Sequence, residues 1–389
     1  MTVIAAIQGA AVGLGDLAVV VLAFLFVLTA IVFVHELGHF LVARWCGVSV
    51  SVFSIGFGKE IFGFNDRHGT RWRVSWIPLG GYVKFLDDDD PTSSKTASDA
   101  AELTPEQRAG AFHLKPVWKR AAVVAAGPIA NFIFAIVLFA LMFWLMGVRT
   151  TAPRVDQVQP GTPAAAAGIQ AGDVIREING APVRSFNAVQ RAIGTSSGDE
   201  VSLIIKRGDE LIPLKMTPVM RKMSDGLGGE MTRPIIGIVR ASKPESFVTK
   251  WPGPVEAVGL GVSETGFIIT STLGFIRDIF RGRQDATQIG GLPHVAEATR
   301  RIVDIGIDRL PYLIAALSVS IGLINLFPIP LLDGGHLMFY AIEAVRRRPL
   351  AEQTQEFAFK VGLAVVLALM IYANLWNGRH IISGWLGLS

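Results

Sequence analysis

The most prominent pattern in the chain is a set of apolar stretches long enough to cross a bilayer. A transmembrane helix takes about 20 predominantly apolar residues. Four stretches meet this requirement, residues 17–42, 117–148, 310–332 and 359–375. The pattern predicts a multi-pass α-helical membrane protein with about four transmembrane helices.

A fifth apolar stretch, residues 254–282, is harder to assign. It is long enough to span, but Glu256, Glu264 and Asp278 interrupt it. A helix with one charged and one apolar side typically lies along the membrane interface. We therefore expect an amphipathic connecting region over residues 250–309, with a fifth span as the alternative.

The segment between the first two spans has a different pattern. Residues 52–86 alternate aromatic or β-branched residues with glycines, which predicts a β-hairpin rather than a helix. Because the segment is so apolar, we expect it to be membrane-associated, with protein or a cavity satisfying its backbone groups. The acidic run Asp87–Asp90 opens a polar stretch, residues 87–112, that is expected to be a solvated linker.

Residues 152–240 have the short strands and glycine turns of a soluble α+β domain. The run VQPGTPAAAAGIQAGDVIREINGAPV, with Asn179-Gly180 as a hairpin turn, resembles a PDZ domain. Such domains bind an extended peptide at a sheet edge. Ile236, Gly237 and Ile238 look like the carboxylate-binding loop, so a peptide C-terminus is a possible ligand. The alternative for Gly237 is a plain bulge glycine.

Composition supports the membrane assignment. The 389 residues are 51% hydrophobic and 17% charged, with a mean hydropathy of +0.45, whereas soluble domains carry about 25% charged residues. The net charge of +4 is spread along the chain, so no nucleic-acid partner is expected. The single cysteine, Cys46, is expected to be a packing residue.

Basic residues in short loops predict the orientation. The loop after the first span is rich in Lys and Arg, and the connection between the third and fourth holds Arg346, Arg347 and Arg348. These loops are expected in the cytoplasm, which places both termini and the PDZ-like domain on the extracytoplasmic side. The first 16 residues contain no Lys or Arg, so we expect the first apolar segment to be retained and not cleaved.

The strongest chemical signal, His35-Glu36-Leu37-Gly38-His39, lies inside the first apolar stretch. Two histidines four apart on a helix share one face and can ligate the same zinc ion. The glutamate between them is placed to take a proton from a water that the metal activates. The flanking residues 17–42 carry no other charge, so the chemistry would take place within the bilayer.

A catalytic zinc ion needs a third protein ligand and an open position. The run NLFPIPLLDGGH ends the third span with prolines, glycines and an ionisable residue, Asp333. Ionisable residues at membrane depth are costly and therefore functional candidates. We expect Asp333 to be the third ligand, with His336 as the rival.

Together these motifs resemble the site-2 protease family of intramembrane zinc metalloproteases. The resemblance covers nearly the whole chain and is closest to the bacterial RseP type, proteases that regulate envelope-stress sigma factors. It implies His35, His39 and Asp333 as zinc ligands and Glu36 as the catalytic base. The RseP type carries two PDZ domains in tandem, whereas residues 149–250 leave room for one.

The resemblance also implies a role for Asn325 in holding substrate near the zinc. Its carboxamide could hydrogen-bond a substrate backbone group or the developing oxyanion; an interhelical hydrogen bond is the alternative. Small residues in the second span, Gly127–Asn131, are expected to serve helix packing.

The implied activity is hydrolysis of peptide bonds within or near transmembrane helices, with the active site towards the cytoplasmic side of the bacterial inner membrane. Anti-sigma factors already cut on their outer side, or leftover signal peptides, are the expected substrates. A substrate helix must unwind before attack, and a strand edge at Gly80, Gly81 and Tyr82 could bind the unwound segment. The alternative is a hairpin that only plugs the cytoplasmic side.

Two other classes of protein fit the residues less well than a protease does. A non-proteolytic, PDZ-bearing membrane sensor or chaperone with a structural zinc site would use four protein ligands and would need no glutamate base. A metal transporter would need polar residues through several spans, and the spans outside the motifs lack them. The residues therefore favour the protease.

Overall fold

The computed structural model describes residues 3–86, 104–196, 198–224, 230–240, 247–284 and 291–372. The chain divides into two compact units, Met1–Phe139 with Gly290–Gly378 and Ala140–Ile289 with Arg379–Ser389, and each is considered by itself. The acidic run Asp87–Asp90 lies outside the described residues. The end of the expected linker is a short helix, α2 (Pro105–Gly110), which begins with a capping box between Thr104 and Gln107.

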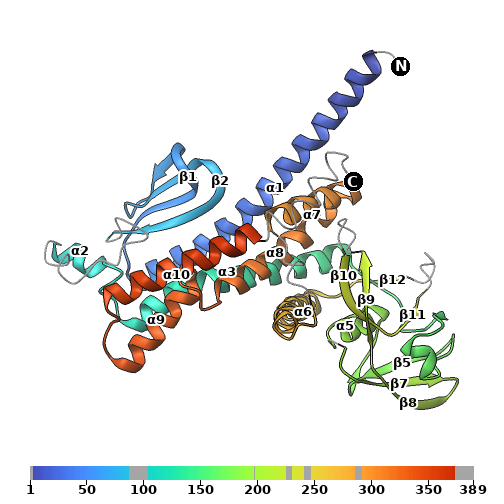
Figure 1. Ribbon diagram of the computed structural model, residues 1–389. Helices are drawn as coiled ribbons and strands as arrows, with labels where there is room; N and C mark the ends of the chain where they lie inside the picture. The colour runs from blue at the N-terminus through green and yellow to red at the C-terminus, as the bar shows by residue number, and fades with distance from the viewer. Residues whose placement is uncertain are drawn as a thin grey trace. The chain divides into compact units, whose positions relative to one another are not determined.

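The first unit is built on long apolar helices (Figure 1). In chain order it contains α1 (Val3–Trp45), most of α3 (Val117–Met146), α7 (Leu292–Ile305), the 3-10 turn η4 (Ile307–Arg309), α8 (Leu310–Asn325), α9 (Asp333–Arg346) and α10 (Glu352–Ile371).

The end of the third expected span differs most from the sequence expectation. The stretch expected as a third span, residues 310–332, is helical only to Asn325. Pro328 and Pro330 follow, and neither has an N–H with which to continue the helix. Asp333 consequently begins α9 instead of ending the span.

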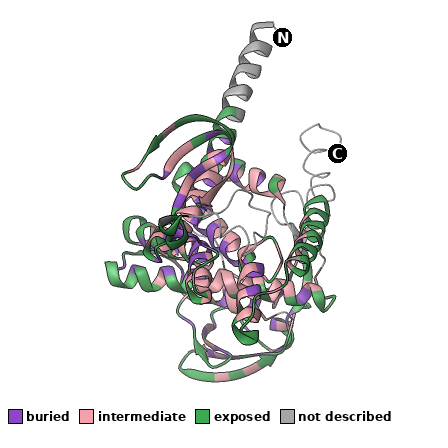
Figure 2. Ribbon diagram, turned by 90° about the vertical axis from the view of Figure 1, so that its left-hand side faces the viewer, coloured by how far each residue is buried: buried purple, intermediate pink, exposed green. Residues whose placement is uncertain are grey.

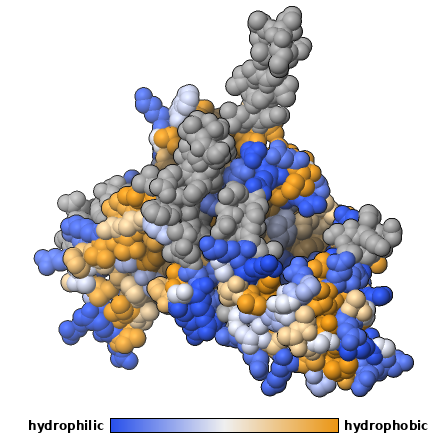
Figure 3. Space-filling view, turned by 45° about the vertical axis from the view of Figure 1, so that its right-hand side comes forward, coloured by the Kyte–Doolittle hydropathy of each residue, from blue (hydrophilic) through white to orange (hydrophobic). Residues whose placement is uncertain are grey.

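The helices of this unit pack through one face and expose apolar side chains on the other. Val27 and Ile31 of α1 form a buried cluster with Leu310 and Ile314 of α8. On α3, by contrast, Ile129, Ile133 and Val137 are exposed at a spacing of four, which places them on one face. Figure 3 shows apolar side chains of this kind at the molecular surface. Apolar faces of this extent suit contact with lipid better than with water.

Five described helices are long and apolar enough to cross a membrane: Ala18–Trp45, Val117–Met146, Pro254–Phe280, Ile307–Asn325 and Gln353–Ile371. The one beyond the four expected spans is α6 (Pro254–Phe280), in the second unit. Two of its acidic residues, Glu264 and Asp278, are buried. The Glu264 carboxylate binds Arg191 of the PDZ-like domain through two contacts, of 2.6 and 3.0 Å.

The expected hairpin region of the first unit is a curved sheet made by β1 (Val50–Asn65) and β2 (Arg71–Phe85), seen beside α1 in Figure 1. Phe53 of β1 pairs with both Val83 and Trp72, so the first half of β1 lies between the two halves of β2. This half packs on α1, whereas the second half, from Phe57 on, is exposed (Figure 2). The free cysteine, Cys46, is buried in the same apolar cluster as Phe53.

The second unit contains the PDZ-like domain. Its main sheet has the strand order β6-β5-β7-β8, formed by β5 (Val174–Ile178), β6 (Ala181–Pro182), β7 (Val201–Arg207) and β8 (Glu210–Met216). Its helices are α4 (Pro163–Ala166) and α5 (Phe186–Gly194). Three strand pairs complete the unit, β4 (Gln157–Val158) with β11 (Ile238–Val239), β9 (Val219–Ser224) with β10 (Glu230–Ile235), and β3 (Val148–Thr150) with β12 (Val248–Lys250).

The core of this domain follows the alternation of its strands. Ile175, Leu203 and Ile205 point inward and pack with Val189 of α5. The Asn179-Gly180 turn between β5 and β6 has φ values of 50° and 77°. Positive φ at both positions is typical of a two-residue hairpin turn, as the sequence predicted.

A buried ion pair also stabilises the PDZ-like domain. The Asp173 carboxylate, about 1% exposed, accepts two 2.8 Å hydrogen bonds from Arg207 and one from the main-chain N–H of Gln170. The bonds from Arg207 lower the pKa of Asp173 from its ordinary value, and the Gln170 bond lowers it further. Burial of the carboxylate acts in the opposite direction and raises the pKa. A carboxyl group with a depressed pKa stabilises the fold at neutral pH, and this contribution is lost as the pH falls through its folded-state pKa.

We expect Asp173→Asn to speed hydrogen exchange of the β5 and β7 amides about tenfold at pH 7, because bonds to a charged acceptor are lost. Mass-spectrometric exchange on the full chain measures this, and the difference from the native protein should vanish well below pH 3.8, the ordinary pKa of the group. Glu200→Gln is the matched control, since Glu200 and its partner Lys215 are exposed. Equal exchange rates in Asp173→Asn and the native chain would contradict the role of the pair.

Candidate active site

Three potential metal ligands that are distant in sequence converge in the first unit. His35 and His39 lie one turn apart on α1, with their Nε2 atoms 3.2 Å apart. The Asp333 carboxylate, in the first turn of α9, lies 3.2 Å from Nε2 of His35 and 3.6 Å from Nε2 of His39. Among the described residues, these three form a group whose ligand atoms all lie within 4.8 Å of one another.

Two glycines allow α3 to approach this group closely. A Cβ atom on Gly38 of α1 would lie 2.4 Å from the carbonyl oxygen of Ala126. A Cβ atom on Gly127 of α3 would lie 2.3 Å from Nε2 of His39 and 2.9 Å from Cε1 of His35. Real Cβ atoms essentially never come this close to other atoms, so the crossing of α1 and α3 requires glycine at both positions.

The same helix supplies a partner for the second nitrogen of each histidine. Nδ1 of His39 lies 2.9 Å from the carbonyl oxygen of Val123. Because a carbonyl only accepts, Nδ1 of His39 carries a proton, and in the neutral imidazole this leaves the lone pair of Nε2 towards Asp333. Nδ1 of His35 lies 3.2 Å from the side-chain amide of Asn131. The Gly127–Asn131 segment, predicted only to pack helices, thus contacts both histidines.

The backbone around Asp333 shows why two glycines follow it. A Cβ atom on Gly334 would lie 2.2 Å from the carbonyl oxygen of Phe327, and one on Gly335 would lie 2.5 Å from that of Ile329. The proline loop therefore packs directly beneath the first turn of α9. Leu331 in this loop has a φ of 103°, a strained value for a residue with a side chain.

A second contact holds α9 against α3. Arg120, near the start of α3, bonds to Glu343 of α9 at 2.6 Å. Its guanidinium also lies over the ring of Tyr340, 4.9 Å from the centroid. The helix that begins with Asp333 is therefore held by the same helix that contacts both histidines.

The group fits a zinc ion. Oδ2 of Asp333 is buried and has no hydrogen-bond partner among the described residues. With His39 in the neutral form, its Nε2 and a carboxylate oxygen of Asp333 face each other at 3.6 Å as two acceptors, so a cation between them would remove the repulsion. Two imidazole nitrogens and one carboxylate oxygen form a common donor set of catalytic zinc sites, and they leave one position open.

Glu36 lies between the two histidines in sequence and next to the edge of the curved sheet. A Cβ atom on Gly81 would lie 3.1 Å from Cγ of Glu36 and 3.0 Å from Cγ1 of Val32. The Glu36 carboxylate also accepts a main-chain hydrogen bond from Val83. The segment that the sequence suggested for substrate binding thus directly adjoins the HELGH helix.

The other two residues proposed in this segment contact the rest of the sheet. Gly80 has a φ of 124°, and a Cβ atom there would lie 2.3 Å from the ring of Phe57. Tyr82 stacks on the same Phe57 ring, with centroids 6.0 Å apart, and pairs with Ser54 of β1.

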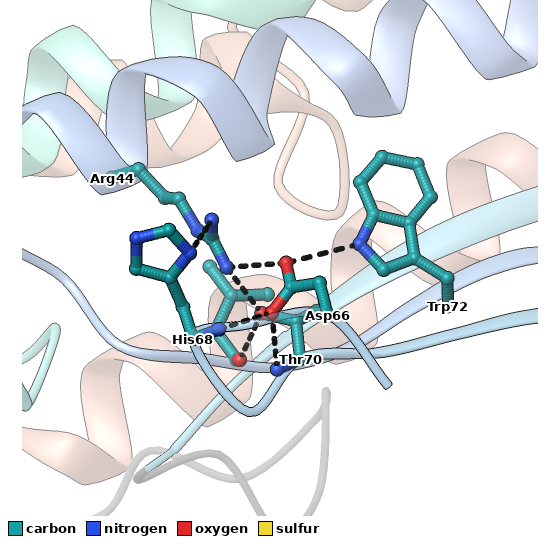
Figure 4. Close-up of polar contacts among 6 residues, drawn as sticks. Arg44, Asp66, His68, Thr70 and Trp72 are labelled. Atoms are coloured by element: carbon teal, nitrogen blue, oxygen red, sulfur yellow. Dashed lines mark hydrogen bonds and ion pairs between the residues drawn. The ribbon is translucent and has the colours of Figure 1, made fainter. Parts of the chain in front are cut away.

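A polar cluster fixes the sheet to the end of α1 (Figure 4). Arg44 donates to Asp66 at 2.6 Å and to Thr70 at 2.9 Å, and its other terminal nitrogen lies 3.0 Å from the ring of His68. Asp66 also accepts hydrogen bonds from the Trp72 indole and from the main chain of His68 and Thr70. The cluster therefore contributes to the position of the sheet edge beside Glu36.

Among the described residues, His336 is not part of the three-ligand group. The ring of His336 packs against Phe359 of α10, with centroids 5.3 Å apart, and against Phe339 at 6.5 Å. Asn325 is the last residue of α8 and is partly buried.

In the second unit, the expected peptide-binding segment lines a groove of about 960 Å³. Ile236, Gly237 and Ile238 form one wall and α5 another. Gly237 has a φ of 86°, and a Cβ atom there would lie 2.2 Å from Oγ1 of Thr162. Helix α6 contributes Phe267 and other residues to the groove, which the sequence did not predict.

The first unit combines a candidate zinc centre, an adjacent glutamate and helices with apolar outer faces. Together these features indicate that the protein is a membrane metalloprotease. The chain matches the model of Peptidase family M50 over residues 23–369 and therefore belongs to that family. It is a zinc-dependent metalloendopeptidase of the site-2 protease family, as the motifs predicted.

Relatives support this assignment along nearly the whole chain. A zinc metalloprotease of Agrobacterium fabrum is 46% identical over 91% of this chain and 94% of its own length. Metalloprotease MmpA of Caulobacter vibrioides is 35% identical over 92% of this chain and 95% of its own length. The solved PDZ domain of an SdrC-like protein from Listeria monocytogenes is 28% identical, with a TM-score of 0.19 over 22% of this chain and 83% of its own.

The close crossing of α1 and α3 gives a testable prediction. Gly127→Ala should lower both the zinc content and the thermal stability of the purified protein, because the added methyl would overlap the His39 ring. Elemental analysis and thermal unfolding in detergent measure the two effects. The matched control is Gly266→Ala in α6, where a Cβ atom would meet nothing within 4 Å. A Gly127→Ala protein with full zinc content would show that the site tolerates a wider crossing.

Proposed function

We propose that the protein hydrolyses peptide bonds within or near transmembrane helices of other membrane proteins. The observation that carries the proposal is the placement of the candidate metal group on α1. Both histidines lie within Ala18–Trp45, which is long and apolar enough to span, and Asp333 joins them from α9. A substrate that reaches this group is itself membrane-embedded or close to the membrane.

In the proposed mechanism, His35, His39 and Asp333 hold the zinc ion. When bound, the zinc supplies Lewis acidity that polarises the scissile carbonyl and makes the attacking water more acidic. Glu36 accepts the proton of this water and then passes it to the leaving amine. Asn325 would hold a substrate backbone group near the scissile bond through its carboxamide.

The sheet edge beside Glu36 would bind the unwound substrate. The carbonyls of a helical substrate are occupied by its own hydrogen bonds, so the cleaved segment needs replacement partners. Residues 81–83 pair with Phe53, Ser54 and Ile55 on one side, and the described residues provide no strand on the other. We assign Gly80, Gly81 and Tyr82 to substrate binding at this edge.

We also propose a location, an orientation and natural substrates for the protein. We place the protein in the bacterial inner membrane. The distribution of basic residues favours an orientation with its termini and PDZ-like domain outside and its active site towards the cytoplasm. The groove at Ile236, Gly237 and Ile238 would bind a peptide C-terminus or limit the size of the substrate. Anti-sigma factors after a first cut, or remnant signal peptides, are the proposed substrates.

Glu36→Gln tests the catalytic base. We expect this variant to retain zinc and to lose cleavage of a reconstituted transmembrane substrate, because a carboxamide cannot take the proton from water. Cleavage in proteoliposomes and elemental analysis on the same preparation separate the two properties. Cleavage at the native rate by Glu36→Gln would remove Glu36 from the mechanism. Membrane fragments that accumulate in cells with this variant would identify the natural substrates.

Asp333→Ala tests the ligand set. Because two histidines alone bind zinc weakly, we expect the stoichiometry of zinc to fall well below one per chain after dialysis. His336→Ala is the matched control, since the His336 ring packs on Phe359 and Phe339. Full zinc content in Asp333→Ala together with loss of zinc in His336→Ala would show that His336, and not Asp333, is the third ligand.

A further inference from the structure

The contact between His35 and Asn131 points to a function beyond helix packing. Asn131 is fully buried on α3, and its amide lies 3.2 Å from Nδ1 of His35. Val123, eight residues earlier, contacts Nδ1 of His39. Residues at a spacing of eight lie on the same face of a helix, two turns apart. One face of α3 therefore contacts the Nδ1 atom of both histidines.

The chemistry of the imidazole determines which amide atom must face it. A neutral imidazole carries one proton, so a histidine that ligates metal through Nε2 carries its proton on Nδ1. That proton needs an acceptor, which the Asn131 side chain can provide through Oδ1. In the structure the amide nitrogen Nδ2 faces His35, and Oδ1 is then buried with no hydrogen-bond partner among the described residues. The two amide orientations have nearly the same shape, so the hydrogen-bond network decides between them.

The backbone of Asn131 is held from the opposite side by α8. The buried hydroxyl of Ser318 donates to the main-chain oxygen of Asn131 at 3.0 Å. Gly322, one turn further along α8, lies so close that a Cβ atom there would be 3.1 Å from Cβ of Asn131. These contacts restrict the position of the Asn131 backbone, and neither of them uses the side-chain amide that reaches His35.

We propose that Asn131 is a positioning residue for the metal site, which fixes the tautomer and the ring orientation of His35 by accepting the Nδ1 proton. The inference rests on the proposed role of His35 as a zinc ligand and adds a residue that does not touch the metal. Partners of this kind typically change metal affinity by about 10–100-fold when removed.

The affinity of the purified full-length protein for zinc, measured by competition with a chelator, tests the role. Asn131→Leu keeps a similar volume but offers no acceptor, so we expect zinc to bind about 10–100-fold more weakly. Asn131→Asp keeps an acceptor at the same place and should restore most of the affinity. Ser318→Ala is the control for packing, because it removes the bond to α8 and leaves the amide intact.

A purely structural role would give a different result. Asn131→Leu and Ser318→Ala would then lower the thermal stability of the metal-free protein alike while zinc affinity stayed native, and the proposal would be overturned. Equal weakening by Asn131→Leu and Asn131→Asp would also overturn it, because an acceptor alone would not suffice. The His35→Ala variant tests the proposed ligand set separately from the proposed role of Asn131. Native zinc affinity in His35→Ala would refute the ligand set itself.

Discussion

The close crossing of α1 and α3 is the constraint on which the rest of the site depends. Two histidines one turn apart can share a metal only when their rings are held in one orientation, and the other nitrogen of each ring sets that orientation. Glycines at positions 38 and 127 bring the helices near enough for α3 to reach both rings. A wider crossing would leave each ring free to rotate and would open the group to solvent.

Separate contacts hold the proposed third ligand, Asp333, and the proposed substrate-binding edge to this helix pair. Arg120 of α3 binds Glu343 of α9, the helix that begins with Asp333. Arg44 at the end of α1 binds Asp66, so the curved sheet is tied to the helix that bears Glu36. The proposed metal ligands, the proposed base and the strand edge are thereby all held by the pair of helices α1 and α3. A catalytic reaction requires such alignment to within about 0.5 Å.

Much of the site could be predicted from the sequence because its signals are local. The HELGH spacing defines one face of a helix, and prolines followed by Asp333 and glycines mark a break near the membrane. The partners of the histidines were not predictable in the same way. Val123 acts through a main-chain carbonyl that every residue has, and Asn131 lies 96 positions from His35. Only tertiary structure shows that the small residues of the second span lie against the imidazoles of α1.

The sheet was predicted less completely than the helices, for a similar reason. Alternation of aromatic residues and glycine indicated strands, but it could not show that Phe53 has neighbours on both sides. That double pairing brings the Gly81 segment against Glu36 and leaves the second half of β1 exposed. Ile61 and Phe62 in this exposed half are apolar, which agrees with a sheet that dips into lipid.

Burial helps to choose between the two interpretations that the sequence left open for helix α6. Its buried face carries Glu264, which binds Arg191 of α5, whereas Val255, Val258 and Val262 form an exposed apolar face. Since Glu264 lies near the middle of the helix, a spanning orientation would draw α5 into the hydrocarbon, together with its exposed Asn187 and Gln190. Desolvating those groups is costly. We therefore propose a position along the interface, with the valine face in lipid and the carboxylate face on the PDZ-like domain, because it satisfies both surfaces.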